Sequence, residues 1–114
     1  MECNDTIEIN GIRYHRETPM AAGFVIVRTY SAGVFMGILV RRDGKEVELK
    51  NARRLWKWSG AASLSQLAME GVKNPDECKF PQEVKSIILT EAIEIITCTH
   101  KAIQSIQGVP EWKV

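Results

Sequence analysis

The alternation of apolar and polar positions predicts β-strands over the first half of the chain. Thr6–Ile9 and Ile12–His15 both alternate, and Asn10-Gly11 lies between them. Asn-Gly is typical of a type I′ turn, because both central residues of that turn need a positive φ. The sequence therefore predicts an N-terminal β-hairpin, which ends at a loop around Pro19.

Three further strands are predicted at Gly23–Tyr30, Val34–Arg41 and Lys45–Leu49. The first two are rich in β-branched and aromatic residues, and the third alternates. Arg42-Asp43-Gly44 is typical of a tight turn, in which glycine takes a left-handed conformation. Short connections between consecutive strands predict an antiparallel meander.

Two short helices are predicted in the second half of the chain. Ser63–Glu70 has a serine to cap its start, Gln66 three residues later as in a capping box, and Gly71 at its end. A terminal helix is predicted over Thr99–Gln107, with Thr99 as its cap and Gly108 after it. The Pro-containing segment 73–81 is expected to be a loop.

Two segments leave alternatives open. Asn51–Trp58 fits a short strand, or an irregular turn leading into one, better than a helical turn, although Ala, Arg and Leu favour helix. In Val84–Cys98, Thr90-Glu91-Ala92 separates two strand-like halves, Ser86–Leu89 and Ile93–Thr97, and a single helix is the alternative. The predicted class is α+β, a mainly antiparallel sheet with two short helices.

Composition limits what the protein can be. A chain of 114 residues is expected to form one domain with one modest core. A formal charge of +1 argues against a protein that packages duplex DNA. Three widely spaced cysteines without a CxxC motif indicate reduced thiols rather than a disulfide framework or a zinc site. No signal peptide is expected, and the longest apolar run, Ala32–Val40, is too short to span a bilayer.

Sequence motifs of common enzymes do not occur. We find no GxSxG, P-loop, GxGxxG or HExxH motif. His15 and His100 are expected to be surface residues, and Glu91 with Glu94 is a weak candidate for a carboxylate pair. The sequence therefore predicts no catalytic residue, no metal site and no cofactor.

One candidate binding segment is Arg28–Gly37. Arg28 and Tyr30 share a face if the segment is a strand, and the backbone N–H groups of Ser31–Gly33 could form a nest for an anion. The alternative is a plain hairpin, in which Gly33 serves the turn and Tyr30 packs in the core.

A second candidate segment is Ala52–Gly60, where cations alternate with indoles. Arg53 and Arg54 could bind phosphate oxygens, and Trp56 and Trp58 could stack on a base. The alternative is that both tryptophans lie in the core and both arginines are solvated. Residues 41–57 contain seven Lys/Arg and three acids, a local charge of +4 that suits one small polyanion.

At these segments the chain resembles a family of small phage proteins, identified as the Thoeris anti-defence sponges. The resemblance covers most of residues 23–112 and leaves residues 1–20 as an N-terminal hairpin extension. It rests on V-R-T-Y-S-A-G-V at Val27–Val34, R-D-G-K-E-V-E-L-K-N-A-R-R-L-W-K-W-S-G-A-A-S-L-S-Q-L-A at Arg42–Ala68, C-K-F-P at Cys78–Pro81, and L-T-E-A-I-E-I-I at Leu89–Ile96.

The resemblance implies a protein without enzymatic activity, acting in the cytoplasm of the host bacterium. Such a sponge binds the cyclic ADP-ribose isomer made by a TIR-domain immune enzyme and holds it uncleaved. It implies a homodimer with pockets at the subunit interface, or a hexamer that also holds cyclic oligonucleotides, and no membrane or duplex DNA partner. The ligand's phosphates, adenine and riboses suggest ten binding residues: Arg28, Tyr30, Ser31, Gly33, Arg53, Arg54, Trp56, Trp58, Thr90 and Glu91.

Two other functions remain open on the sequence. One is a phage accessory module that binds single-stranded nucleic acid through the Arg/Trp segment, which predicts binding that weakens with salt. The other, less favoured, is a small phosphodiesterase for cyclic nucleotides, against which the missing histidine pair and metal cluster argue.

Overall fold

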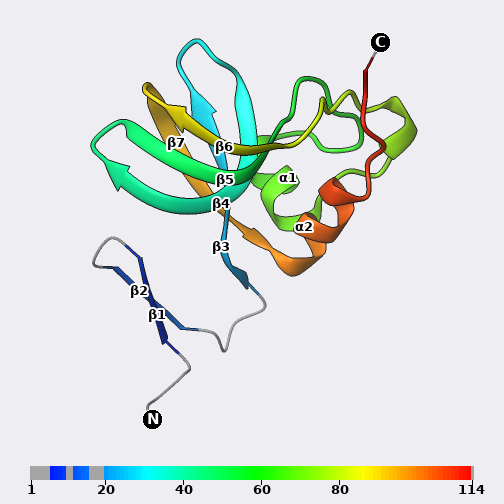
Figure 1. Ribbon diagram of the computed structural model, residues 1–114. Helices are drawn as coiled ribbons and strands as arrows, with labels where there is room; N and C mark the ends of the chain where they lie inside the picture. The colour runs from blue at the N-terminus through cyan, green and yellow to red at the C-terminus, as the bar shows by residue number, and fades with distance from the viewer. Residues whose placement is uncertain (1–5, 10–11, 16–19, 114) are drawn as a thin grey trace.

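A computed structural model describes residues 6–9, 12–15 and 20–113 of the chain, with side chains from residue 23 onward. It confirms the predicted class, α+β with a mainly antiparallel sheet and two short helices (Figure 1). The strands are β1 (Thr6–Ile9), β2 (Ile12–His15), β3 (Met20–Thr29), β4 (Val34–Asp43), β5 (Glu46–Arg54), β6 (Val84–Leu89) and β7 (Ala92–Thr99). The helices are α1 (Leu64–Glu70) and α2 (His100–Gln107), and a 3₁₀ turn, η1, spans Pro75–Glu77.

The main sheet has five strands in the order β6-β5-β4-β3-β7, and all neighbours are antiparallel. The predicted meander of β3, β4 and β5 is confirmed, and β6 extends it. The position of β7 beside β3, at the opposite edge from β6, is a long-range pairing that no local pattern predicts. The N-terminal hairpin is also confirmed, because β1 pairs with β2 from Thr6–His15 to Ile9–Ile12, while its predicted turn lies outside the described residues.

The sheet curls strongly, because one short turn connects its two edges. β6 and β7 are consecutive in sequence, and only Thr90 and Glu91 separate them. The Ala92 N–H donates to the Lys45 carbonyl at 3.0 Å, and the Tyr30 N–H donates to the Glu91 carbonyl at 2.9 Å. These bonds close one end of the sheet around an apolar interior.

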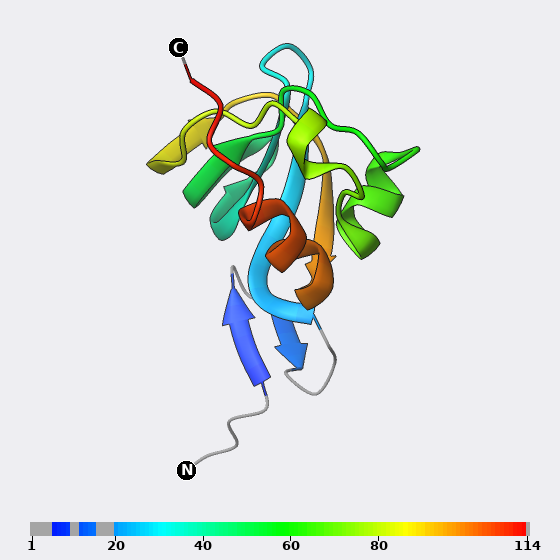
Figure 2. The ribbon, with the colours of Figure 1, turned by 90° about the vertical axis from the view of Figure 1, so that its right-hand side faces the viewer.

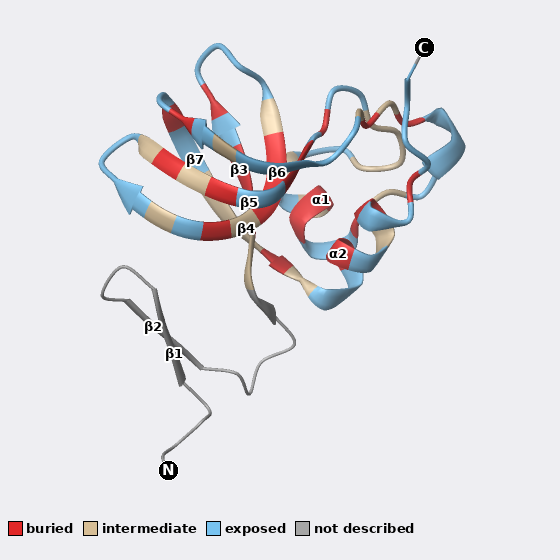
Figure 3. Ribbon diagram, viewed as in Figure 1, coloured by how far each residue is buried: buried red, intermediate tan, exposed pale blue. Residues whose placement is uncertain are grey.

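The interior of the curl holds one of two hydrophobic clusters. In the first half of β5, buried Val47 and Leu49 alternate with partly buried residues, whereas Phe35–Gly37 of β4 is buried on both faces (Figure 3). Gly37 permits the tight curvature, because a Cβ there would lie 3.1 Å from the Ala52 Cα. The cluster consists of Val25, Val27, Phe35, Leu39, Val47, Leu49, Ala52, Leu89 and Ala92.

Both helices cover the other face of the sheet (Figure 2), where they contact β3 and β7. Ile26 and Met36 point to this side and meet Leu67, Phe80 and Ile106 in the second cluster. Because β3 is buried on both faces, its sequence is a nearly continuous apolar run.

The helix ends follow the sequence predictions. The Ser63 side chain accepts a hydrogen bond from the Gln66 N–H at 3.1 Å, and Gly71 ends α1 with φ of 79°. Thr99 caps α2 by accepting from the Ala102 N–H, and Gly108 follows its last residue. These local signals are therefore confirmed.

The ambiguous segments are also resolved. β5 continues through Asn51, whose φ is 52°, to Arg54, and Lys57 then forms a bridge to Lys79, so the strand interpretation of this segment is confirmed. Residues 84–98 form two strands, so the single-helix alternative is wrong. The predicted turn at Arg42-Asp43-Gly44 begins later than expected, because β4 runs to Asp43 and the turn is at Gly44 and Lys45.

Candidate ligand-binding site

Six of the ten predicted binding residues gather where the β3–β4 turn meets the β6–β7 turn. They are Arg28, Tyr30, Ser31, Gly33, Thr90 and Glu91, here called the turn cluster. The Ser31 hydroxyl donates to Glu91 Oε1 at 2.7 Å, and Arg28 Nε donates to Glu94 Oε1 at 2.9 Å. Through these contacts Arg28, Ser31 and Glu91 of the turn cluster are bonded within the protein itself.

The structure contradicts part of each of the two interpretations of this turn. Tyr30 does not pack in the core, because it is 78% exposed. The anion nest is compromised, because the Ala32 N–H already donates to Thr29 Oγ1 at 2.9 Å. Gly33 takes φ of 100°, so its role in this structure is to permit the turn.

Arg53 is a structural residue in this geometry. Only 7% of it is exposed, and each of its three nitrogens donates to a backbone carbonyl. The acceptors are Pro81 at 3.2 Å, Ile106 at 3.0 Å and Phe80 at 3.1 Å. Burial lowers the pKa of the guanidinium, while Glu111 and Glu83 act in the opposite direction. We therefore do not retain Arg53 as a phosphate ligand.

Arg54 lies on the opposite face of β5 and is exposed. Its guanidinium carbon stands 4.6 Å from the centre of the Phe35 ring, a cation–π contact over the inner cluster. This contact leaves the N–H groups of Arg54 accessible. Arg54 lies next to the start of β4, because the N–H of the following residue, Leu55, donates to the Val34 carbonyl.

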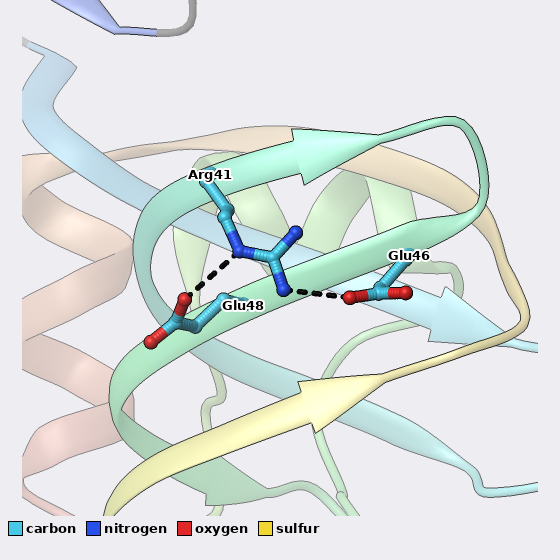
Figure 4. A network of polar contacts seen from close by, with 3 residues as sticks. All are labelled: Arg41, Glu46 and Glu48. Atoms are coloured by element: carbon cyan, nitrogen blue, oxygen red, sulfur yellow. Dashed lines mark hydrogen bonds and ion pairs between the residues drawn. The ribbon is translucent and has the colours of Figure 1, made fainter.

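The basic segment 41–57 does not form one patch. Arg41 donates to Glu46 at 2.6 Å and to Glu48 at 3.1 Å (Figure 4). These bonds raise the pKa of Arg41 and occupy two of the three acids of the segment. With Arg53 buried and Arg41 paired, the expected polyanion site would have to combine the remaining cations of the segment with cations from elsewhere.

The three tryptophans of the chain meet in one region. Trp56 stacks on Trp112, with ring centres 5.0 Å apart and planes tilted by 34°. Trp58 packs partly against the cluster beneath the helices, and both Trp58 and Trp112 line the same groove. Trp56 is 58% exposed and Trp112 39% exposed, so the stacked pair presents aromatic surface to solvent.

Lysines accompany the stacked rings. Lys57 and Lys79 pair across two extended segments through two backbone hydrogen bonds of 3.2 and 2.7 Å. Side chains of residues paired in this way lie on the same face, where like charges repel each other. Lys79 Nζ lies 5.7 Å from the Trp56 ring centre and 5.5 Å from that of Trp112. An anion placed between the two lysines would relieve their repulsion.

Beside the stacked Trp56 and Trp112 lies an open groove of about 430 Å³, here called the tryptophan groove. It is lined by Lys57, Trp58, Ser59, Asp76, Glu77, Cys78, Lys79 and Trp112. Among the described residues, no ion pair joins its lysines to its carboxylates. Among these described residues, the groove therefore offers aromatic faces together with lysines and carboxylates that do not pair with each other.

The sequence predicted this site only in part. Trp58 lines the groove and Trp56 stacks on Trp112 at its edge, whereas Lys79 and Trp112 were not among the candidates. Lys79 lies at the groove because its segment pairs with Lys57. Trp112 lies there because its backbone N–H donates to the Phe80 carbonyl at 3.0 Å. The unusual number of tryptophans in a short chain was the only available signal for Trp112. No hydrogen bond, ion pair or aromatic contact between described side chains connects this groove to the turn cluster.

Other site chemistries receive little support within the part of the chain that the structure describes. No group of three or more metal-ligating side chains occurs there. Cys98 is fully buried, and burial raises the pKa of its thiol to about 12, which makes it a poor nucleophile. No helix among the described residues has the length and apolar character needed to cross a membrane.

The chain belongs to the family described as "Domain of unknown function (DUF6948)", which matches residues 22–106. The match includes Trp56, Trp58 and Lys79, together with the five strands of the main sheet. No curated protein and no solved structure matches the chain.

Proposed function

We propose that the protein binds a nucleotide ligand in the tryptophan groove and holds it without cleaving it. The observation that carries this proposal is the exposed Trp56–Trp112 pair with Lys79 beside it. Stacking of a base on an aromatic side chain is worth about 1–3 kcal/mol, and the paired Lys57 and Lys79 supply charge for phosphate.

Together with the resemblance to the Thoeris anti-defence sponges, this supports a specific function. The protein sequesters a cyclic ADP-ribose isomer, or another cyclic nucleotide immune signal, in the cytoplasm of the phage's host. The ligand has a flat base, two phosphates and several hydroxyl groups, and each has a complementary group in the groove. The turn cluster, which the sequence also suggested, is a less suitable site because Ser31 and Glu91 bond to each other and Arg28 is paired with Glu94.

A protein that sequesters a signal must bind it tightly, and one open groove does not enclose a ligand enough for tight binding. A nanomolar Kd corresponds to about −12 kcal/mol, which requires a ligand enclosed on most sides. We propose that a second copy of the chain closes the groove, in a homodimer or a larger ring such as a hexamer.

Isothermal titration calorimetry against cyclic ADP-ribose isomers and cyclic di- and trinucleotides tests the proposal. We expect at least one of these ligands to bind, and Trp56→Ala or Trp112→Ala to weaken binding by tenfold or more. Tyr30→Ala is the matched control, because it removes an exposed aromatic side chain from the turn cluster and should leave affinity unchanged. Bound ligand released by denaturing the protein should be chemically intact.

Two results would overturn this proposal. If none of the ligands binds, the groove has another function. If the released ligand is ring-opened or hydrolysed, the protein is an enzyme, such as the small phosphodiesterase considered above.

The open shape of the groove also favours a second candidate, a module that binds single-stranded nucleic acid. Stacked tryptophans with lysines alongside suit successive bases and their phosphates. A fluorescent dodecamer of riboadenylate or deoxythymidylate would then bind with an affinity that falls steeply with salt. If neither oligonucleotide binds at physiological ionic strength, this second candidate is excluded.

A further inference from the structure

The carboxylates of the tryptophan groove require an explanation that phosphate binding does not give. Asp76 and Glu77 lie on η1 and line the same groove as Lys57 and Lys79. For an anionic ligand alone, two acids would be unfavourable, since they repel its phosphates. Neither acid is neutralised by a lysine of the groove within the described residues.

Glu77 is held in place by neighbouring polar groups. The Ser59 hydroxyl donates to Glu77 Oε1 at 3.1 Å, and Asn74 Nδ2 donates to the same hydroxyl oxygen at 3.1 Å. Ser59 follows Trp58 directly, so this chain of hydrogen bonds fixes the carboxylate next to the indole. The remaining oxygen of Glu77 can still accept a hydrogen bond.

Asp76 is exposed beside Glu77, and no hydrogen bond to it appears among the side chains that the structure describes. A carboxylate is an acceptor only, so the groups that complement this edge of the groove are hydroxyl or amine donors. In a nucleotide, the hydroxyls of the ribose lie between the base and the phosphates. Carboxylates are common partners for ribose hydroxyls in nucleotide-binding proteins.

We infer that the tryptophan groove selects a ligand with a free ribose 2′-hydroxyl, and that Asp76 and Glu77 accept hydrogen bonds from the hydroxyls of that sugar. This inference rests on the proposed function and adds the sugar to it. The base stacks on Trp56 and Trp112, the phosphates lie between Lys57 and Lys79, and the ribose faces η1. The groove should therefore discriminate against deoxyribose, which lacks the 2′-hydroxyl donor.

Calorimetry with ADP and 2′-deoxy-ADP on the full chain tests this inference. The two probes carry the same base and the same two phosphates and differ in one hydroxyl. We expect ADP to bind at least tenfold more tightly than 2′-deoxy-ADP. In at least one of Asp76→Ala and Glu77→Ala, the one that removes the acceptor of the 2′-hydroxyl, the advantage of ADP should shrink to about threefold or less, with no loss of affinity for 2′-deoxy-ADP.

Glu70→Ala is the charge-matched control, because it removes one exposed acid at the end of α1, outside the groove. It should keep the preference for ADP. If the Asp76 and Glu77 variants strengthen both probes equally, the two acids only repel phosphate and the inference is wrong.

The two proposals fail in different ways. Equal affinity for ADP and 2′-deoxy-ADP, with binding that still depends on Trp56, would overturn the ribose assignment and leave nucleotide binding intact. Failure of both probes and of the cyclic nucleotides above would overturn both.

Discussion

Arg53 offers the sharpest test of how this fold is held together. Its guanidinium connects β5 to the segment 80–81 and to the last turn of α2, through three carbonyls. In Arg53→Met the aliphatic stem keeps its packing, and only the charged donors are lost. The result measures what those donors contribute.

The magnitude follows from the partners that remain. A hydrogen bond from a charged donor stabilises a folded protein by about 1.5–3 kcal/mol. Two of the three carbonyls keep a second donor, because Phe80 accepts from Trp112 and Ile106 accepts from Val109. Methionine also removes the cost of burying a cation, so the loss is smaller than three full bonds. We expect Arg53→Met to lower the free energy of unfolding by about 3 kcal/mol, a large share of the ~5–15 kcal/mol typical of a domain.

Urea denaturation followed by tryptophan fluorescence and circular dichroism gives this free energy directly. Arg54→Met is the matched control, since it alters the neighbouring residue in the same way. Arg54 is exposed, and within the described part of the chain its one polar side-chain contact is the one over Phe35, worth about 0.5–1 kcal/mol. Arg53→Lys should lose most of what Arg53→Met loses, because one ammonium cannot reach three carbonyls in a fork.

Equal stability of Arg53→Met and the parent protein would refute this reasoning. It would show that burying the charge costs as much as the three bonds contribute. If Arg53→Met instead retained stability and lost ligand affinity, Arg53 would be a binding residue, as the sequence first suggested.

Three further predictions concern the helices and the core. Gly71→Ala should destabilise the protein by about 2–4 kcal/mol, because Gly71 has a positive φ and a Cβ there overlaps the Ser105 side chain. Gly44→Ala also has a positive φ but its Cβ meets open space, so it should cost only about 1–2 kcal/mol in the same urea titration. Equal costs would contradict the overlap argument. Thr99→Ala should lower the free energy of unfolding by about 2 kcal/mol, because the Thr99 hydroxyl both caps α2 and donates to the Met69 carbonyl of α1 at 2.7 Å. Thr99→Ser keeps the hydroxyl and should unfold near the urea midpoint of the parent protein. A large loss of stability in the serine variant would show that Thr99 acts through packing instead. Burial raises the pKa of Cys98 to about 12, above the ~8.5 of an unfolded thiol. The protonated Cys98 thiol therefore contributes fully to the free energy of unfolding below about pH 8.5. As the pH rises toward 12, the free energy of unfolding falls by at most about 1.4 kcal/mol per pH unit. Stability measured against pH should therefore fall less steeply over that range in Cys98→Ala, and parallel curves would disprove the assignment.

Short-range signals gave most of the secondary structure. The caps at Ser63 and Thr99, the glycines at 44 and 71, and the apolar alternation of β5 each act within a few residues. Such interactions form whatever the rest of the chain does, so a sequence can report them. For the same reason the predicted break at Thr90-Glu91-Ala92 separated β6 from β7, although β7 already begins at Ala92.

The candidate site was predicted less well, because its parts come from distant segments. The pairing of Lys57 with Lys79 brings the segment before β6 beside the end of β5, and Trp112 arrives on the C-terminal segment. No periodicity links these positions. The turn cluster shows the opposite case, in which residues that looked suitable for a ligand bond to each other instead.

The sequence by itself determined the strands, the two helices and the presence of aromatic and basic residues suited to a nucleotide. Only the tertiary structure decided where β7 pairs, that Arg53 is buried and Arg54 is not, and that Trp58 and Trp112 line one groove with Trp56 stacked on Trp112. The physical reason is that caps, turns and alternation depend on neighbours in the chain. The environment of a side chain depends on which distant segments the curled sheet brings against it.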